Sequence, residues 1–461
     1  MLIVRDSASA PSYRDESKGV ASKMNSLNAN PSIETSIPVS SAYFRTLLVL
    51  SFIMSITPIL FKITGLASYG YPYNITAILL WFLPFIGVYI YFLLFIAGSR
   101  GLSTKPIALL AQPSKRLAKI SWVISIMYFY FSFYSLIPAG MSIFDIDRLH
   151  ELFGQFGTVA FTPVGQIMNI LAPIIFVISF RAVAAKSKNI ILWHGPFMIM
   201  VGCLLLTGKR QTLIFTIFCL FAAWVIRQSR LSFGTITKLT MGVVLSFGLI
   251  LLIGWQRSGF TTFQDQLNHN SAFMNQEHRD GPFGALGLFY LYLGGGIEVL
   301  SVATDRFEPL YKPFSATSTF ALRRINAFFD YVDYERDVVP VSSAILTDSL
   351  GGFGRIWAGT NLQLYIEGGL FWVISTFLIV VSIYYRAIYL LSRGRLLVID
   401  LMFLFSFSLH QLFIFPLRDQ FVLLAYVYYI FWRLFVYRRQ NFVPWSPDPS
   451  PTKAGATPPS P

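Results

Sequence analysis

Charged residues are scarce in this sequence. Asp, Glu, Lys and Arg make up 13% of its 461 residues, whereas a soluble protein carries about 25%. Hydrophobic residues make up 54% of the chain and aromatic residues 16%. Because so few charges cannot cover a large soluble domain, the composition excludes a conventional soluble enzyme. It indicates a chain that lies mostly in lipid, where aromatic side chains gather at the membrane interfaces.

Cysteine and the common ligand motifs are also scarce. The two cysteines, Cys203 and Cys219, lie in apolar runs and form neither a disulfide framework nor a paired-cysteine zinc site. The sequence contains no HExxH motif, no P-loop and no GxGxxG motif. We therefore predict no metal and no cofactor. The net charge of +14 is spread between apolar runs, which argues against nucleic-acid binding.

Apolar runs long enough to cross a membrane recur between polar ends. A hydrocarbon core of about 30 Å needs roughly 20 helical residues. Such runs occur at 45–64, 75–98, 119–139, 163–181, 190–207, 211–227, 237–255, 362–385, 396–416 and 420–437. They predict an all-α polytopic membrane protein with about ten transmembrane helices in a domain at 45–437. The polar segment 1–44 and the Pro-rich segment 438–461 are predicted to be disordered cytoplasmic tails.

The distribution of Lys and Arg predicts the orientation of the spans, because cytoplasmic loops carry the excess of basic residues. Basic clusters occur in the N-terminal tail and at 99–119, 181–188, 227–238, 386–395 and 433–439. All of them face the cytoplasm only if the apolar, Gly-rich segment 283–303 does not cross the membrane. We therefore predict cytoplasmic N- and C-termini and one long extracytoplasmic loop, 256–361. Within it, 283–303 is expected to re-enter the membrane or to lie at its interface.

Several basic residues fall on the predicted outer side, where the charge rule disfavours them. They are Lys209, Arg210, Arg257, Arg324 and Arg418. A guanidinium group holds phosphate through two parallel hydrogen bonds, so these residues are candidates for binding a diphosphate. The alternatives are an ion pair between Arg418 and Asp419, and extension of Lys209 and Arg210 towards lipid headgroups.

Three residues on the same side are candidates for a general base. Glu367 lies about a turn inside the outer end of a span, where a carboxylate is costly and usually functional, although a helix-capping role is the alternative. Asp348 precedes a Gly-rich stretch in LTDSLGGFGR, and a turn hydrogen bond is its alternative. His278, in the outer loop, is a candidate because an imidazole can act as a base near neutral pH. His410 lies two helical turns before Arg418, so it either faces the same cavity as Arg418 or packs between helices.

Three stretches resemble motifs of the bacterial oligosaccharide repeat-unit polymerases, the Wzy-type O-antigen polymerases. LLLTGKRQTLIF resembles their small residue and Arg at an outer helix turn. GTNLQLYIEGGLFWVI resembles their entry into the span after the long outer loop, and LYLGGGIEVL resembles a Tyr–Gly segment earlier in that loop. The topology is similar over most of 45–437. Two positions depart from the family pattern: Lys209 replaces a small residue, and Glu367 replaces the commoner Asp.

The resemblance implies a metal-independent glycosyltransferase with a GT-C-like helical fold at the outer face of the bacterial cytoplasmic membrane. It would move a growing glycan from polyprenyl diphosphate to a lipid-linked repeat unit, which builds O-antigen, capsule or exopolysaccharide. The cations would hold the diphosphate, and Glu367, His278 or Asp348 would take the proton of the acceptor hydroxyl. Expected partners are lipid-linked glycans, membrane lipids, a chain-length regulator and a flippase.

Two other functions use the same features. An O-antigen ligase shares the donor and differs in the acceptor. A transporter or flippase for the lipid-linked glycan also needs basic residues in a cavity, but such proteins usually carry internal repeats and charges at the membrane midplane. This chain shows no repeat, and its unexplained charges gather on the outer side. The pattern favours an enzyme over a transporter and leaves both polymerase and ligase open.

Overall fold

The computed structural model describes most of the predicted membrane domain. The described residues are 36–38, 41–66, 68, 70–99, 106–108, 113–133, 163–187, 189–206, 210–228, 296–312, 360–412 and 419–436, with single residues at 234, 237, 241 and 248. Almost all of them are helical. Most of the predicted span 237–255 and most of the predicted loop 256–361 fall outside this description.

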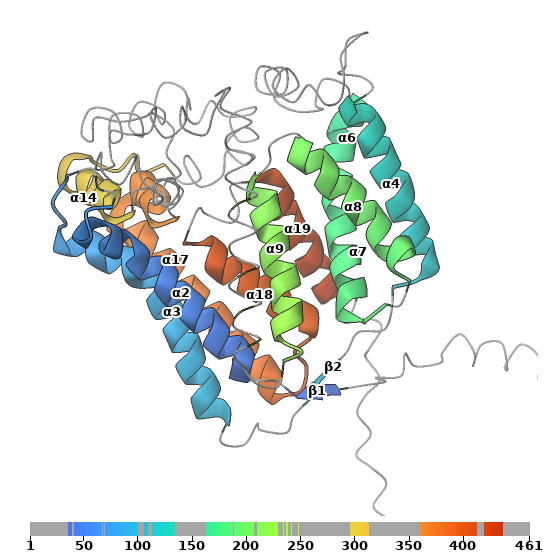
Figure 1. Cartoon of the computed structure of the whole chain (residues 1–461), viewed down its shortest axis with the longest axis horizontal. Helices are drawn as coiled ribbons and strands as arrows, with labels where there is room; N and C mark the ends of the chain where they lie inside the picture. The colour runs from blue at the N-terminus through green and yellow to red at the C-terminus, as the bar shows by residue number, and fades with distance from the viewer. Residues whose placement is uncertain are drawn as a thin grey trace, which may run out of the picture.

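The helices pack side by side, mostly antiparallel to their neighbours in the chain (Figure 1). In chain order they are α2 (Ser41–Ile63), α3 (Ile75–Ser99), α4 (Lys115–Phe133), α6 (Pro163–Leu171), α7 (Pro173–Ala184), α8 (Ile190–Leu206), α9 (Arg210–Val225), α14 (Gly296–Arg306), α17 (Thr360–Ser392), α18 (Val398–His410), α19 (Gln420–Phe431) and the π-helix Trp432–Val436. A small antiparallel sheet pairs β1 (Ser36–Pro38) with β2 (Pro106–Ala108).

Several of these helices suit a membrane. Four described helices are long and apolar enough to cross one, and they are Ser41–Ile63, Ile75–Gly98, Ile167–Ala184 and Thr360–Ser392. Shorter apolar helices occupy 190–204, 211–225, 398–410 and 420–435. The structure thus confirms a helical chain suited to a membrane. The count of about ten spans and the GT-C-like arrangement stay predictions.

The outward-facing side chains support the same conclusion. Ile75 is 77% exposed, Phe371 75% and Ile379 61%. In water such large apolar side chains would form a costly surface, whereas lipid tails accommodate them without loss. Inside the bundle, aromatic rings fill the space between helices. Phe403 stacks on Tyr429 with ring centroids 4.3 Å apart, and Tyr91 stacks on Tyr384 at 4.6 Å.

The first long helix begins before the first predicted apolar run. Helix α2 starts at Ser41 rather than at 45, and β1 lies inside the segment predicted as a disordered tail. The reason is burial: Tyr43 and Phe44 are 0% and 1% exposed in the core. Tyr43 also donates a hydrogen bond to the carbonyl oxygen of Leu401, at 3.0 Å, which fastens the start of α2 to α18.

Helix contacts bring distant segments together at two ends of the bundle. At one end, which we call the sheet end, the start of α2 meets the end of α3, where Phe44 stacks on Phe95 at 3.9 Å. At the opposite end, which we call the α14 end, the Nε1 atom of Trp81 donates to the carbonyl oxygen of Ser55 at 2.8 Å. In Figure 1, α14 lies across this second end, over the tips of α2, α3 and α17.

An ion pair between Asp400 and Arg433 closes the sheet end. The Nε atom of Arg433 lies 3.1 Å from Asp400 Oδ1, and Asp400 Oδ2 accepts from the backbone N–H of Leu397 at 2.9 Å. The same carboxylate therefore caps the start of α18 and holds the end of the last described helix. Asp400 also accepts a hydrogen bond from the hydroxyl of Tyr429, so its carboxylate is engaged by three residues of the fold and has a structural role.

Candidate functional site

Glu367 lies where α17 is broken at the α14 end. Two residues after it, Gly369 has φ 64° and ψ −157°, a conformation that side chains with a Cβ rarely adopt. A Cβ added there would lie 3.1 Å from Cγ of Pro309. The chain after α14 packs against this break, and the N–H of Leu310 donates to the carbonyl oxygen of Ile366 at 2.7 Å. That hydrogen bond satisfies a backbone acceptor released by the break.

The carboxylate of Glu367 is fully buried. Its exposed fraction is 0%, and its Oε2 atom accepts a hydrogen bond from Nε1 of Trp372 at 2.9 Å. The adjacent Ile366 belongs to an apolar cluster. Glu367 directly precedes the two non-helical glycines of α17, Gly368 and Gly369, so a capping role for the helical segment after the break remains the alternative. A buried carboxylate beside a helix break inside a span is costly, which indicates a function.

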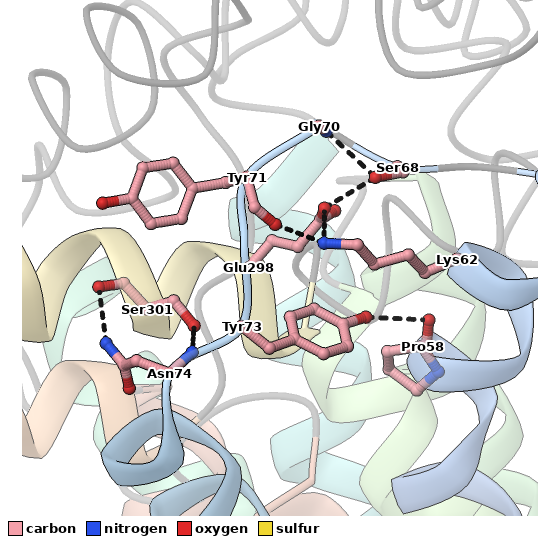
Figure 2. A network of polar contacts seen from close by, with 9 residues as sticks. All are labelled: Pro58, Lys62, Ser68, Gly70, Tyr71, Tyr73, Asn74, Glu298 and Ser301. Atoms are coloured by element: carbon pink, nitrogen blue, oxygen red, sulfur yellow. Dashed lines mark hydrogen bonds and ion pairs between the residues drawn. The ribbon is translucent and has the colours of Figure 1, made fainter.

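A second buried carboxylate, Glu298, lies on the first turn of α14 (Figure 2). It is 0% exposed, and its Oε1 atom is 2.8 Å from Nζ of Lys62 and 2.6 Å from Oγ of Ser68. Lys62 ends α2, donates to the carbonyl oxygen of Tyr71 and lies 4.0 Å from the ring centre of Tyr73. The ammonium group therefore joins α2, the connection 64–74 and α14.

Asn74 fixes the same connection on α14. Its Nδ2 atom donates to Oγ1 of Thr304 at 2.8 Å and to Oδ1 of Asp305 at 2.6 Å, while its Oδ1 atom accepts from the N–H of Ala77 at 2.6 Å. Asn74 thus caps α3 and holds α14 at once. Burial and the charge of Glu298 raise the pKa of the Tyr73 phenol, so Tyr73 stays a neutral hydrogen-bond donor.

Gly296 explains why α14 can approach α2 so closely. It is the third glycine of the GGG run, has φ +56°, and a Cβ added to it would lie 2.6 Å from Cβ of Pro58. No side chain fits that space. Of the predicted re-entrant segment 283–303, residues 296–303 are described, and all of them are buried or nearly so at the start of α14.

Arg210 is the first residue of α9. Two residues on, Thr212 Oγ1 donates to Oδ1 of Asp419 at 3.2 Å. The Oδ1 atom of Asp419 also caps α19, because it accepts from the N–H of Phe421 at 2.8 Å. The first turns of α9 and α19 therefore meet. They lie beside the end of α18, because Ser406 of α18 donates to the carbonyl oxygen of Phe215 at 3.2 Å. These contacts use the Oδ1 atom of Asp419, and the predicted pairing of Asp419 with Arg418 involves a residue outside the described part of the chain.

His410 and Gln411 end α18 at the same end of the bundle. His410 is 0% exposed, and neither ring nitrogen has a hydrogen-bond partner among the described residues. Gln411 lines a small cavity together with Thr360 and Asn361 at the start of α17. The cavity thus brings the end of α18 beside the start of α17, the helix that carries Glu367. Helix α18 in turn packs along α9, which begins at Arg210.

The remaining predicted site residues lie outside the described residues. They are Lys209, Arg257, Arg324, Arg418, His278 and Asp348. The structure therefore bears on Glu367 and on the backbone position of Arg210. No group of three or more His, Cys, Asp or Glu side chains that could hold a metal ion occurs in the part of the chain that the structure describes.

Two residues of this end were missed at the sequence level, Lys62 and Glu298. Both carried a readable signal. Lys62 is one more basic residue at the predicted outer end of a span, against the charge rule. Glu298 is an acid within an otherwise apolar segment, a position that usually marks a function or a buried pair.

Comparison with known proteins adds no relative to these observations, because no protein-family model, no curated protein and no solved structure matches the chain. The chemistry must be argued from the site. The described residues of the α14 end offer two buried carboxylates and one ammonium group, and α9 offers a helix N-terminus elsewhere in the bundle. A buried carboxylate is suited to accept a proton, and a helix N-terminus is suited to an anion.

Proposed function

We propose that this protein is a glycosyltransferase that polymerises polyprenyl-diphosphate-linked repeat units at the outer face of a bacterial cytoplasmic membrane. The product would be a surface polysaccharide such as O-antigen, capsule or exopolysaccharide. The proposal rests on the resemblance of three short motifs. It is supported by where described parts of two of those motifs lie, since Glu367 belongs to α17 and Gly296 to α14, and these two helices are in contact.

One observation carries the proposal: a fully buried carboxylate, Glu367, beside a glycine break inside a long apolar helix. Irregular backbone within a span persists where it is covered by protein or lines a site. A carboxylate buried at a free-energy cost within a span usually has a function. In a glycosyl transfer that function would be to accept the proton of the acceptor hydroxyl.

The reaction assigns a role to each kind of group. The acceptor hydroxyl oxygen attacks the anomeric carbon of the donor sugar, and the bond from that carbon to the diphosphate oxygen breaks. Glu367 takes the hydroxyl proton, and the polyprenyl diphosphate leaves with the electron pair. Arg210 and the N-terminus of α9 would stabilise the charge that develops on the diphosphate.

A ligase is the second candidate, because it uses the same donor. A transporter fits less well. Transporters of charged substrates place charges near the membrane midplane. Among the described residues the fully buried acids are Glu298, Glu367 and Asp400, and they lie toward the two ends of the bundle. Asp400 is already paired with Arg433.

Deletion of the gene separates the three functions. A polymerase mutant accumulates lipid-linked single repeat units on the outer face and makes no long glycan. A ligase mutant accumulates long glycan on the lipid carrier. A transporter mutant accumulates single units on the cytoplasmic face, where an externally added glycosidase cannot reach them. Extraction of lipid-linked glycans with and without that glycosidase measures the difference. Normal glycan in the deletion strain would contradict all three.

A further inference from the structure

A small cavity lies between the start of α17, the end of α18 and the side of α3. Thr360, Asn361 and Gln411 form its polar side, and Trp81 and Leu300 form its apolar side, with Gly296 at the start of α14. The volume of the cavity is about 10 Å³. That is room for one water molecule or one hydroxyl group, not for a whole sugar ring.

Two polar atoms of the lining residues have no hydrogen-bond partner among the described residues. They are Oγ1 of Thr360 and Nε2 of Gln411. Thr360 is 3% exposed and Gln411 7%. Asn361 is different, because its Nδ2 atom donates to the carbonyl oxygen of Leu80. An unpaired buried polar atom is costly, and native proteins contain few of them, so two at one cavity need an explanation.

The lining also restricts the chemistry of a ligand. None of the described residues that line the cavity is charged. A phosphate or a carboxylate requires cations or several backbone N–H groups. The described lining of the cavity contains no Lys or Arg side chain. A hydroxyl group suits it, since it accepts from the amide of Gln411 and exchanges a hydrogen bond with the hydroxyl of Thr360.

We propose that this cavity is a subsite for a hydroxyl group of the glycan, read by Thr360 and Gln411. The inference rests on the proposed function. It adds a sugar-binding site that is distinct from the residues proposed to bind the diphosphate. Neutral side chains at the start of α17 and the end of α18 bind a hydroxyl group of the sugar. The subsite belongs to α17, the helix that also carries Glu367, and Thr360 lies about two helical turns before that carboxylate.

Isosteric substitutions test this proposal. Thr360→Val and Gln411→Met remove the unpartnered atoms while keeping the volume. We expect each to slow chain extension about three- to tenfold, the usual effect of one lost hydrogen bond to a ligand. Thr360→Ser keeps the hydroxyl and should keep the rate. Thr46→Val is the matched control, because Thr46 is also 3% exposed with an unpartnered Oγ1, but lies in α2 toward the sheet end.

The readouts are polymer formed per unit time in gene-deleted cells complemented with each full-length variant, and the melting temperature of each purified variant. Slower extension with an equal or higher melting temperature supports the subsite, since removal of an unpaired polar atom does not destabilise a fold. Normal extension overturns it and assigns the cavity a water only. Slower extension with a lower melting temperature overturns it as well, because the role is then structural. Unchanged glycan in the deletion strain overturns the proposed function itself.

Discussion

Lys62 Nζ and Glu298 Oε1 lie 2.8 Å apart, although 236 residues separate them along the chain. The pair joins the end of α2 to the first turn of α14. The hydroxyl of Ser68 donates a second hydrogen bond to the same Glu298 oxygen, at 2.6 Å. Glu298 is 0% exposed, whereas the Lys62 side chain is 27% exposed. The carboxylate therefore depends on this partner more than the ammonium does. The pair holds α14 across the end of the bundle that carries Glu367.

Removal of one member of the pair should loosen that end. Lys62→Met leaves the Glu298 carboxylate buried with a lost cation, and we expect a loss of about 2 kcal/mol in the free energy of unfolding. Lys62→Met combined with Glu298→Leu should cost less than the sum of the two single changes, because no charge is left unpaired. Thermal unfolding in detergent measures all three. Strict additivity would show that the two side chains do not interact.

Two glycines are predicted to be irreplaceable for conformational reasons. Gly369→Ala and Gly296→Ala place a Cβ on backbone with φ +64° and +56°, at 3.1 Å from Pro309 and 2.6 Å from Pro58. Each should destabilise the protein by about 1–3 kcal/mol. Gly202→Ala is the control, because it lies within α8 and has nothing within 4 Å of its added Cβ. Melting temperatures of the three variants should separate the first two from the third.

Arg210 is predicted to act through the geometry of its guanidinium group. Arg210→Lys keeps the charge but loses the two parallel donors, so it should remain badly impaired, and Arg210→Ala should abolish chain extension. The loss expected from one contact to a developing anion is about a hundredfold or more in rate. Polymer length on a gel, normalised to protein in the membrane, measures it. Arg386→Lys, on the part of α17 far from Glu367, is the control. Wild-type ladders from Arg210→Ala would remove this residue from the site.

The predicted topology can be tested at two loop positions. In a background with Cys203→Ala and Cys219→Ala, we expect Asn270→Cys and Pro340→Cys both to react with a membrane-impermeant maleimide added to intact cells. Both positions belong to the predicted extracytoplasmic region 256–361, on either side of α14. Reaction at 340 only after permeabilisation would mean that the segment 283–303 crosses the membrane, and the argument from misplaced charges would then fail.

The sequence predicts the helical membrane fold because hydrophobic run length is a local property. It also identifies Glu367, since an acid inside an apolar run is visible without any contact. Breaks inside runs are harder to place. Within the predicted span 163–181 the hydrogen bonding is interrupted between α6 and α7, because Pro173 lacks the N–H that would continue it, although 167–184 still forms one apolar helix long enough to cross a membrane. At the break, Gly369 packs against Pro309, a residue that is remote in sequence.

The other features of the fold and the site could not be predicted from the sequence, because they depend on contacts between distant segments. The pair Lys62–Glu298 combines one residue from a span end with one from a loop segment, and neither position specifies the other. The strands β1 and β2 are three residues long, and each holds a proline at one end, so neither shows the alternation that marks a strand. The unpartnered atoms of Thr360 and Gln411 become visible only when α17 and α18 are placed together.

The most direct test of the proposed function is chain extension by Glu367→Gln compared with Glu367→Asp. The amide keeps the volume and can still accept from Trp372, but it cannot take a proton, so the rate should fall about a hundredfold or more while the protein accumulates normally in the membrane. Glu367→Asp keeps the carboxylate and should retain part of the rate. Lipid-linked single units should accumulate with the amide and decline with the aspartate. A wild-type polymer ladder from Glu367→Gln would contradict the assignment of Glu367 as the base.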